Sequence, residues 1–205
     1  RYDGDDIAFD NVESLQGKYG HHAILLGAKK PLPPGTIEDC SRPEDMAKYD
    51  ILMLADDDVP DGYGMFLPQG TPMVAQSHYV NTSNQPIRVR DVLRIKKIPM
   101  DTVKTWVAPW VTNSFLFSVP PHETATHHFD CEFPVDGQLL VMGGHMHEWG
   151  AAFKIDIGPD PTSLQPFYSV DSWTADYRDN PPVIVRKENP MPIAKGTEPG
   201  AVPAK

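Results

Sequence analysis

The stretch IRVRDVLRI, residues 87–95, alternates apolar and polar side chains for most of its length. Successive side chains on a β-strand point to opposite faces, so this alternation predicts a strand with one face in solvent. Other short runs are rich in β-branched and aromatic residues, are bounded by Gly, Pro, Asn or Asp, and predict further strands. These are His22–Leu26, Met73–Tyr79, Phe115–Val119, Thr126–Phe133, Gln138–His147 and Ala151–Ile157.

Evidence for helices is thin. Residues 43–54 indicate only a short helical or irregular turn, and residues 188–205, rich in Pro, Gly and Ala, indicate a poorly anchored tail. The acidic run at residues 56–58 is expected to be a solvated loop. The 22 prolines suit short strands joined by rigid loops. The sequence therefore predicts an all-β fold of antiparallel sheets, of the sandwich type.

The length of the chain, 205 residues, allows one large β domain or two small ones. Residues 96–113 hold two prolines and two tryptophans and follow the alternating stretch, so we expect a domain boundary there. We predict an N-terminal domain at 1–98 and a C-terminal domain at 99–205, halves of ordinary domain size.

The charge and hydropathy of the chain exclude some functions. A formal net charge of -10 argues against binding to nucleic acid, which rewards a basic surface. No run of 18 apolar residues is present, so we expect no membrane span. No signal peptide is visible, but the chain starts at Arg1 instead of an initiator Met, so we expect it to be processed or trimmed.

Five of the eight histidines fall in three groups far apart in the sequence: His21-His22, His78, and His145 with His147. On a strand, residues i and i+2 share a face, so His145 and His147 should project together as a bidentate pair for a metal ion. Met146 should then face the other way and pack.

The other histidine groups are less regular. His21 and His22 are neighbours, which point to opposite faces of a regular strand, so a twist or strand end is needed for both to reach one ion. Gly20, directly before them, favours such an irregularity. We expect His122, His127 and His128 to be structural or surface residues. Trp149, Trp173 and Tyr177 are expected in the core.

Together, the three groups resemble a known family. In this order they resemble the copper type II, ascorbate-dependent monooxygenases, which include peptidylglycine α-hydroxylating monooxygenase and dopamine β-monooxygenase. The resemblance covers most of the chain. The matching pieces are His21-His22-Ala23-Ile24-Leu25-Leu26-Gly27, Gln76-Ser77-His78-Tyr79 and Gly144-His145-Met146-His147-Glu148-Trp149-Gly150.

The resemblance implies two tandem, jelly-roll-like β-sandwich domains with one copper each. By analogy, His21, His22 and His78 would bind an electron-transfer copper. His145 and His147 would bind a second copper that activates O2. A methionine completes that site in the family, and Met191 is the only methionine after Met146. Imidazole suits copper, and a thioether favours Cu(I).

Further expectations follow from the resemblance. Ascorbate, or another one-electron reductant, would supply electrons, and a small-molecule or peptide substrate would be hydroxylated. The family implies a secreted, periplasmic or secretory-lumen location and disulfide-bonded cysteines. The family partners of Cys40 and Cys131 would fall outside these 205 residues, and so would its methionine strand. The residues themselves leave three cysteine states open: a mutual pair, free thiols, or partners elsewhere.

Two other functions remain open. The first is a protein that binds or sequesters copper without catalysis. The second is a cupin-like mononuclear metal enzyme built on His145 and His147, although a cupin needs a later Glu and a later His, and Glu148 is too close while no His follows His147. The sequence specifies neither the substrate nor the oligomeric state.

Overall fold

The computed structural model describes residues 1–40, 43–54, 59–114, 117–178 and 180–204 and has an all-β fold, as predicted. The acidic run 56–58 and the first two residues of the predicted strand Phe115–Val119 lie outside these ranges. Among the described residues, no helix is long and apolar enough to cross a membrane.

The chain divides into two compact units, residues Arg1–Val111 and Thr112–Lys205. The division lies inside the 96–113 segment but later in the chain than the predicted boundary between 98 and 99. It lies later because the short strand Thr105–Trp106 pairs in parallel with Tyr63–Leu67 and so belongs to the first unit.

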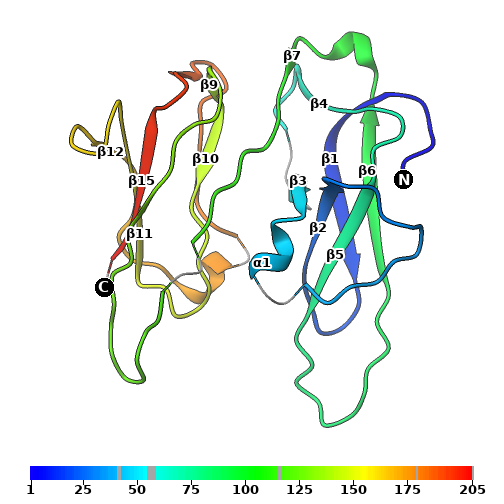
Figure 1. Cartoon of the computed structure of the whole chain (residues 1–205), viewed down its shortest axis with the longest axis horizontal. Coiled ribbons are helices and arrows are strands. Elements are labelled where there is room, and N and C mark those ends of the chain that lie inside the picture. Colours follow the sequence, from blue (N-terminus) through cyan, green and yellow to red (C-terminus); the bar gives the residue numbers. More distant parts are fainter. Residues whose placement is uncertain (41–42, 55–58, 115–116, 179, 205) are drawn as a thin grey trace. The chain divides into compact units, whose positions relative to one another are not determined.

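Unit 1 contains two sheets (Figure 1). One has the strand order β6-β1-β4-β7 and the other the order β3-β2-β5. All neighbours are antiparallel except β4 and β7. The elements are β1 Ile7–Gln16, β2 Gly20–Ala28, α1 Pro43–Met46, β3 Tyr49–Leu54, β4 Tyr63–Leu67, β5 Met73–Tyr79, β6 Asp91–Ile98, the 3-10 turn η1 Met100–Thr102 and β7 Thr105–Trp106.

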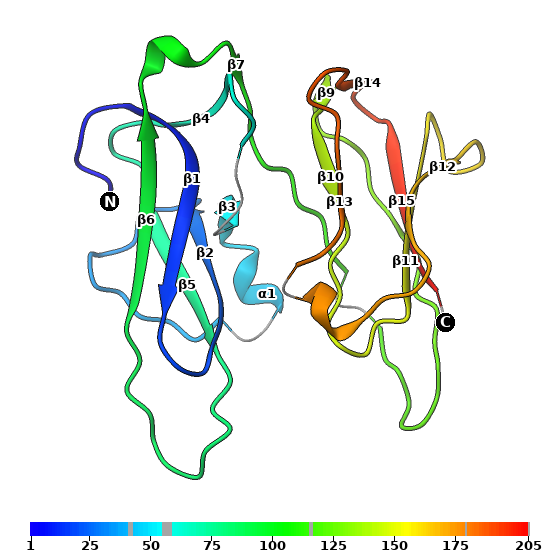
Figure 2. The same cartoon turned by 180° about the vertical axis from the view of Figure 1, so that it is seen from behind.

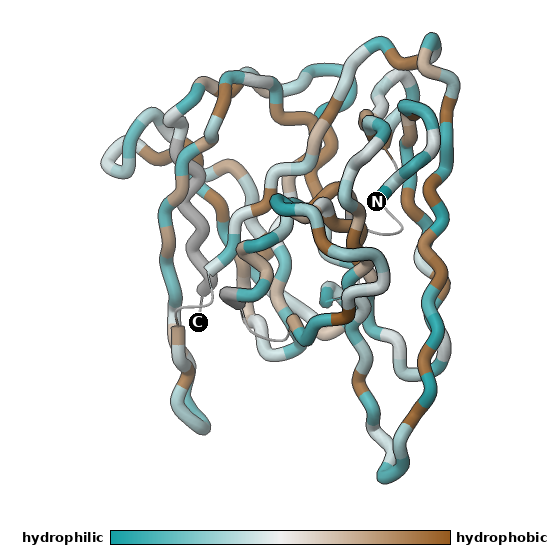
Figure 3. The backbone as a smooth tube through the Cα atoms, turned by 45° about the vertical axis from the view of Figure 1, so that its right-hand side comes forward, coloured by the Kyte–Doolittle hydropathy of each residue, from teal (hydrophilic) through white to brown (hydrophobic). Residues whose placement is uncertain are grey.

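The core of unit 1 draws side chains from both sheets. Phe9 and Val12 of β1 and Leu67 of β4 pack with Leu25 of β2 and Met53 of β3. Burying each such side chain contributes about 1.5–3 kcal/mol relative to leaving it in water. Figure 3 shows apolar and polar residues alternating along the strands. The two sheets are thus held together by a shared apolar layer, which is a sandwich-like arrangement.

Unit 2 contains shorter strands in three sheets (Figure 2). The largest has the order β12-β11-β15-β8, and the pairs β10-β13 and β14-β9 form the others. The elements are β8 Phe129–Asp130, β9 Gly137–Leu139, β10 Val141–Gly143, β11 Ala152–Gly158, β12 Gln165–Val170, the 3-10 turn η2 Ala175–Arg178, β13 Val183–Val185, β14 Met191–Ile193 and β15 Glu198–Ala204.

The core of unit 2 centres on Ile155, Tyr168, Val170 and Trp173. Tyr177 packs against this core, so the prediction that Trp173 and Tyr177 are core residues is confirmed. The prediction for Trp149 is wrong because 93% of its surface is exposed. Trp149 follows the end of β10 in a turn, where no strand periodicity directs its indole inward.

Several predicted strands differ in extent. Residues 87–90 are not in the strand, which begins at Asp91 and continues to Ile98. The predicted strand Gln138–His147 is two short strands that end at Gly143, and Thr126–Phe133 keeps only Phe129–Asp130. Residues 117–119 form no strand.

The prediction of a poorly anchored tail at residues 188–205 is wrong. Residues 198–204 form β15, which pairs with all seven residues of β11 on one side and with β8 on the other. Pro199 and Pro203 lack a backbone N–H, but they lie outside the two positions that pair with β8. The strand is therefore placed by its partners in the sheet, and local composition gives no sign of it.

No disulfide is present among the described residues. Cys40 lies in unit 1 and Cys131 in unit 2, and they are the only two cysteines of the chain. Of the three cysteine states left open by the sequence, the mutual pair is therefore not formed, and Cys40 is half-buried.

Candidate metal centre

A β-bulge at the start of β2 places His21 and His22 beside His78. In the ladder between β2 and β5, Gly20 pairs with Tyr79, and His22 pairs with His78. His21 is therefore one extra residue on β2 between two consecutive ladder pairs, which is the definition of a bulge. A bulge re-aims neighbouring side chains, so two adjacent histidines can face one point. This is the irregularity that the His21-His22 pair requires.

The three imidazoles form a compact cluster, called here the triad. Ring centroids lie 4.8 Å apart for His21 and His22, 4.8 Å for His21 and His78, and 4.9 Å for His22 and His78. Each residue offers a ring nitrogen, and these three atoms lie within 4.8 Å of one another. All three residues are half-buried.

These distances fit a single ion. Imidazole nitrogens bind first-row metals at about 2.0–2.1 Å, so two nitrogens on one ion lie roughly 3–4 Å apart. The triad atoms need to move by only about an ångström to reach this separation, which small rotations of the side chains supply. The triad can therefore hold a metal ion.

The three imidazole nitrogens of the triad indicate which metal ions it can bind. Three imidazoles without carboxylate or thiolate favour copper or zinc over magnesium, calcium and iron–sulfur clusters. Among the described residues, the triad is the only group of three or more His, Cys, Asp or Glu side chains with the spacing of metal ligands.

A polar layer lies behind the triad. Tyr79, directly after His78, donates a hydrogen bond from its hydroxyl to Asp91 Oδ1. Burial and this carboxylate together raise the pKa of Tyr79. Burial opposes ionisation of Asp91, but hydrogen bonding, first by Ser77 and then by Tyr79, holds its pKa below the ordinary value. Asp91 therefore carries a negative charge at neutral pH.

The second histidine pair lies in a loop, not in a strand as predicted. β10 ends at Gly143, and His145 and His147 follow in an irregular segment. Their ring centroids are nevertheless 5.4 Å apart with near-perpendicular planes. Both residues are exposed. The two imidazoles are close enough to share an ion, but loop contacts position them instead of strand alternation.

The loop that carries this pair is anchored on several sides. Met146 packs against the unit 2 core, as predicted. The Gly150 N–H donates to the His147 carbonyl at 3.0 Å, and Glu148 forms a 3.8 Å ion pair with Arg178 of η2. The Tyr168 hydroxyl, buried below the loop, interacts with the Gly144 backbone. The pair is thus held on a fixed support despite its exposure.

Gly144 lies directly against the ring of Phe153, and this contact gives a testable prediction. A Cβ at Gly144 would lie 2.1 Å from two ring carbons of Phe153. We expect Gly144→Ala to destabilise the protein by about 1–3 kcal/mol through overpacking. Urea unfolding measures this loss. Gly137→Ala is the matched control, because its nearest neighbour would lie at 3.9 Å. Equal stability of the two variants would contradict the contact.

Met191 lies in the β14-β9 sheet, whereas His145 and His147 follow β10 of the β10-β13 sheet. It lies in β14 and pairs with Leu139 of β9. The assignment of Met191 as a third ligand of that histidine pair therefore stays a prediction.

The remaining histidines have other contacts. His127 lies 2.8 Å from the Ser114 hydroxyl through its Nε2 atom and stacks on Phe117. His128 pairs with Asp130 at 2.8 Å. His122 is exposed in a turn with a positive φ of 62°. None of them belongs to a metal-ligand group among the described residues.

The residues that support the two histidine sites were not found from the sequence. Asp91, Tyr168 and Arg178 reach the sites from distant strands or turns. Only the Gln76-Ser77-His78-Tyr79 piece contained a sign of them, because polar side chains next to a ligand can belong to the hydrogen-bonded layer around a metal site.

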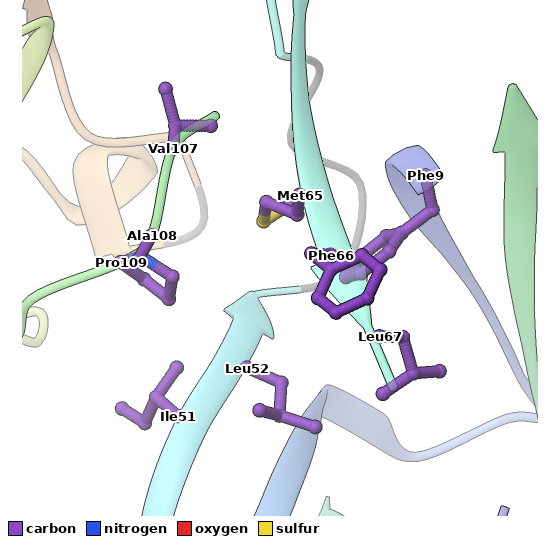
Figure 4. Close-up of a pocket in the computed structure, with 9 residues that line it drawn as sticks. All are labelled: Phe9, Ile51, Leu52, Met65, Phe66, Leu67, Val107, Ala108 and Pro109. Atoms are coloured by element: carbon purple, nitrogen blue, oxygen red, sulfur yellow. The ribbon is translucent and has the colours of Figure 1, made fainter. Parts of the chain in front are cut away.

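The cavity in unit 1 is separate from the triad. About 150 Å³ in volume, it is lined by nine residues that are all apolar, among them Phe66, Val107 and Pro109 (Figure 4). Because no titratable or metal-binding side chain lines it, the cavity offers no group for acid–base or redox chemistry.

No protein-family model matches the chain, and no curated protein matches it.

Proposed function

We propose that this protein is a copper-dependent monooxygenase. The single observation that carries the proposal is the convergence of His21, His22 and His78 on one point. The three residues were selected from the sequence by their resemblance to the copper type II, ascorbate-dependent monooxygenases. Their proximity depends on a bulge and on long-range strand pairing, which the sequence pattern alone does not impose.

The choice of copper rests on the donor set and on the resemblance. Nitrogen sites bind Cu(II) more tightly than the other divalent first-row metals, including zinc. Copper at both histidine sites would supply one-electron redox chemistry and O2 activation. The overall reaction inserts one oxygen atom of O2 into a substrate C–H bond and releases the other as water. Ascorbate supplies the two electrons and two protons.

The two sites suit different tasks. The triad gives three protein ligands in a half-buried position, which suits an ion that exchanges electrons without binding substrate. His145 and His147 give two ligands in an exposed position and leave coordination positions open, as catalytic metal sites require. The proposal therefore assigns electron transfer to unit 1 and oxygen chemistry to unit 2.

We also propose that each unit is a jelly-roll-like β-sandwich domain. In the family, each copper site is held by a jelly-roll-like β-sandwich domain. Unit 1 supports this assignment through its two sheets with a shared core, and unit 2 through its antiparallel strands around Trp173.

A second candidate is a protein that holds copper without catalysis. The histidine pair favours it, because among the described residues no third His, Cys, Asp or Glu side chain forms a metal-ligand group with His145 and His147. Under this candidate the triad loads with copper, but the histidine pair does not turn over O2.

Ascorbate-driven O2 consumption separates the two candidates. The copper-loaded chain is mixed with ascorbate and, as probes, a peptide ending in glycine or dopamine. The monooxygenase proposal predicts substrate-dependent O2 uptake and a product with one added oxygen atom in the mass spectrum. The other outcome is copper bound at the triad with O2 uptake no greater than that of the metal-free chain. This outcome would favour a protein that binds copper without catalysis and would contradict the monooxygenase.

A further inference from the structure

Two residues hold His78 from either side along β5. Ser77 and Tyr79 flank His78, and alternation along the strand turns both side chains to the face opposite the imidazole. Both side chains hydrogen-bond to Asp91. The two neighbours of one triad histidine thus share a single carboxylate.

That carboxylate belongs to the other sheet of unit 1. Asp91 is the first residue of β6, and its ladder partner is Gln16, the last residue of β1. β5 lies in the β3-β2-β5 sheet, so the contact joins the two sheets where the triad sits. The Gln16 side chain lies near the same carboxylate, but its Nε2 atom has no hydrogen-bond partner, so Tyr79 and Ser77 are the groups that hold Asp91.

The same group of residues contacts the bulge before His21. Gly20 pairs with Tyr79, and a Cβ at Gly20 would lie 2.5 Å from the Gln16 Cβ atom. Gln16 therefore packs against the backbone of the residue that precedes His21. The end of β1 and the start of β6 together support both sides of the triad.

We propose that Asp91 is a positioning residue of the triad, which fixes the His78 imidazole through Ser77 and Tyr79. The inference rests on the proposed metal binding by the triad and names the group that orients it. Partners that orient metal ligands typically change metal affinity by about 10–100-fold when they are removed. Asp91 acts one residue further away, through the strand backbone on either side of His78.

Copper titration of variants tests this role. Asp91→Asn should lower the affinity for one equivalent of Cu(II) about tenfold or more, and should change the hyperfine splitting of the Cu(II) spin-resonance spectrum. Tyr79→Phe and Ser77→Ala should each have a smaller effect. Because Asp91 acts through Tyr79, the double variant Asp91→Asn/Tyr79→Phe should bind copper about as well as Asp91→Asn alone.

The controls separate positioning from general stability. Asp101→Asn alters an exposed carboxylate in η1 and should leave affinity and spectrum unchanged. Unchanged copper binding in Asp91→Asn, or simple addition of the Asp91 and Tyr79 effects, would overturn the inference while leaving the metal site intact. If Asp91→Asn does not fold, the variants Ser77→Ala and Tyr79→Phe provide the test. An affinity for Cu(II) equal to that of the wild type in both variants would overturn the positioning role of Asp91. A wild-type chain that binds no copper would refute the proposed function as well.

Discussion

Replacing His78 with alanine should remove the metal ion from the triad. His78 contributes one of three imidazoles, and the other two lie 4.8 Å apart on the bulge. Loss of an orienting partner already costs about 10–100-fold in affinity, so loss of a ligand should cost at least about a hundredfold. Elemental analysis after dialysis should show one metal ion fewer per chain, with copper retained at the other site.

The control for His78→Ala is His122→Asn. His122 is exposed in a turn at φ 62°, a conformation that asparagine tolerates well. This variant removes one imidazole without touching either histidine site, so its metal content should equal that of the wild type. Loss of both ions from His78→Ala, or of neither, would contradict two independent sites. Circular dichroism checks that β5 still pairs in the variant, as its backbone bonds are unchanged.

Replacing His145 with alanine should abolish hydroxylation and leave the triad loaded. His145 and His147 are the two imidazoles of the proposed oxygen site, and one imidazole alone holds copper weakly. We expect about one copper equivalent to be lost and substrate-dependent O2 uptake to fall to background. Ascorbate should still reduce the triad copper, seen as loss of its Cu(II) spin-resonance signal.

Glu148→Gln is the neighbouring control for His145→Ala. It removes the ion pair with Arg178 but neither imidazole, so it should keep both copper ions. If His145→Ala kept full copper content and hydroxylation, the assignment of this pair would be wrong. If it lost the triad copper instead, the two units would not hold their ions independently.

Parts of the fold were predictable because their signals are local. The prediction of Met73–Tyr79 coincides with β5, since a β-branched and aromatic run between prolines and a polar loop is a complete local signal. β1 was missed because Ile7, Ala8 and Phe9 are all buried, on both faces of the strand, and because a bulge between Phe9 and Asn11 then shifts the alternation. A period-2 search fails on such a strand.

Other parts depend on contacts that no local pattern contains. The predicted strand Gln138–His147 ends four residues early, at Gly143, directly before the close contact between Gly144 and Phe153. β15 forms only because β11 and β8 pair with it. In each case a partner distant in the sequence decides the local conformation.

The same distinction applies to the candidate site. The histidines of the triad were found by their order in the sequence, but the bulge that joins His21 and His22 to His78 is a property of strand register. Asp91 had no sequence signal, because its role depends on β6 lying against the end of β5.

X-ray absorption at the copper edge reports which atoms bind the metal at the triad. The measurement uses the double variant His145→Ala/His147→Ala with one equivalent of Cu(II), so that only the triad is available. We expect three imidazole nitrogens at about 2 Å from the metal, with the multiple scattering that imidazole rings produce. A spectrum with only oxygen ligands, or with a single imidazole, would contradict a metal centre built on His21, His22 and His78.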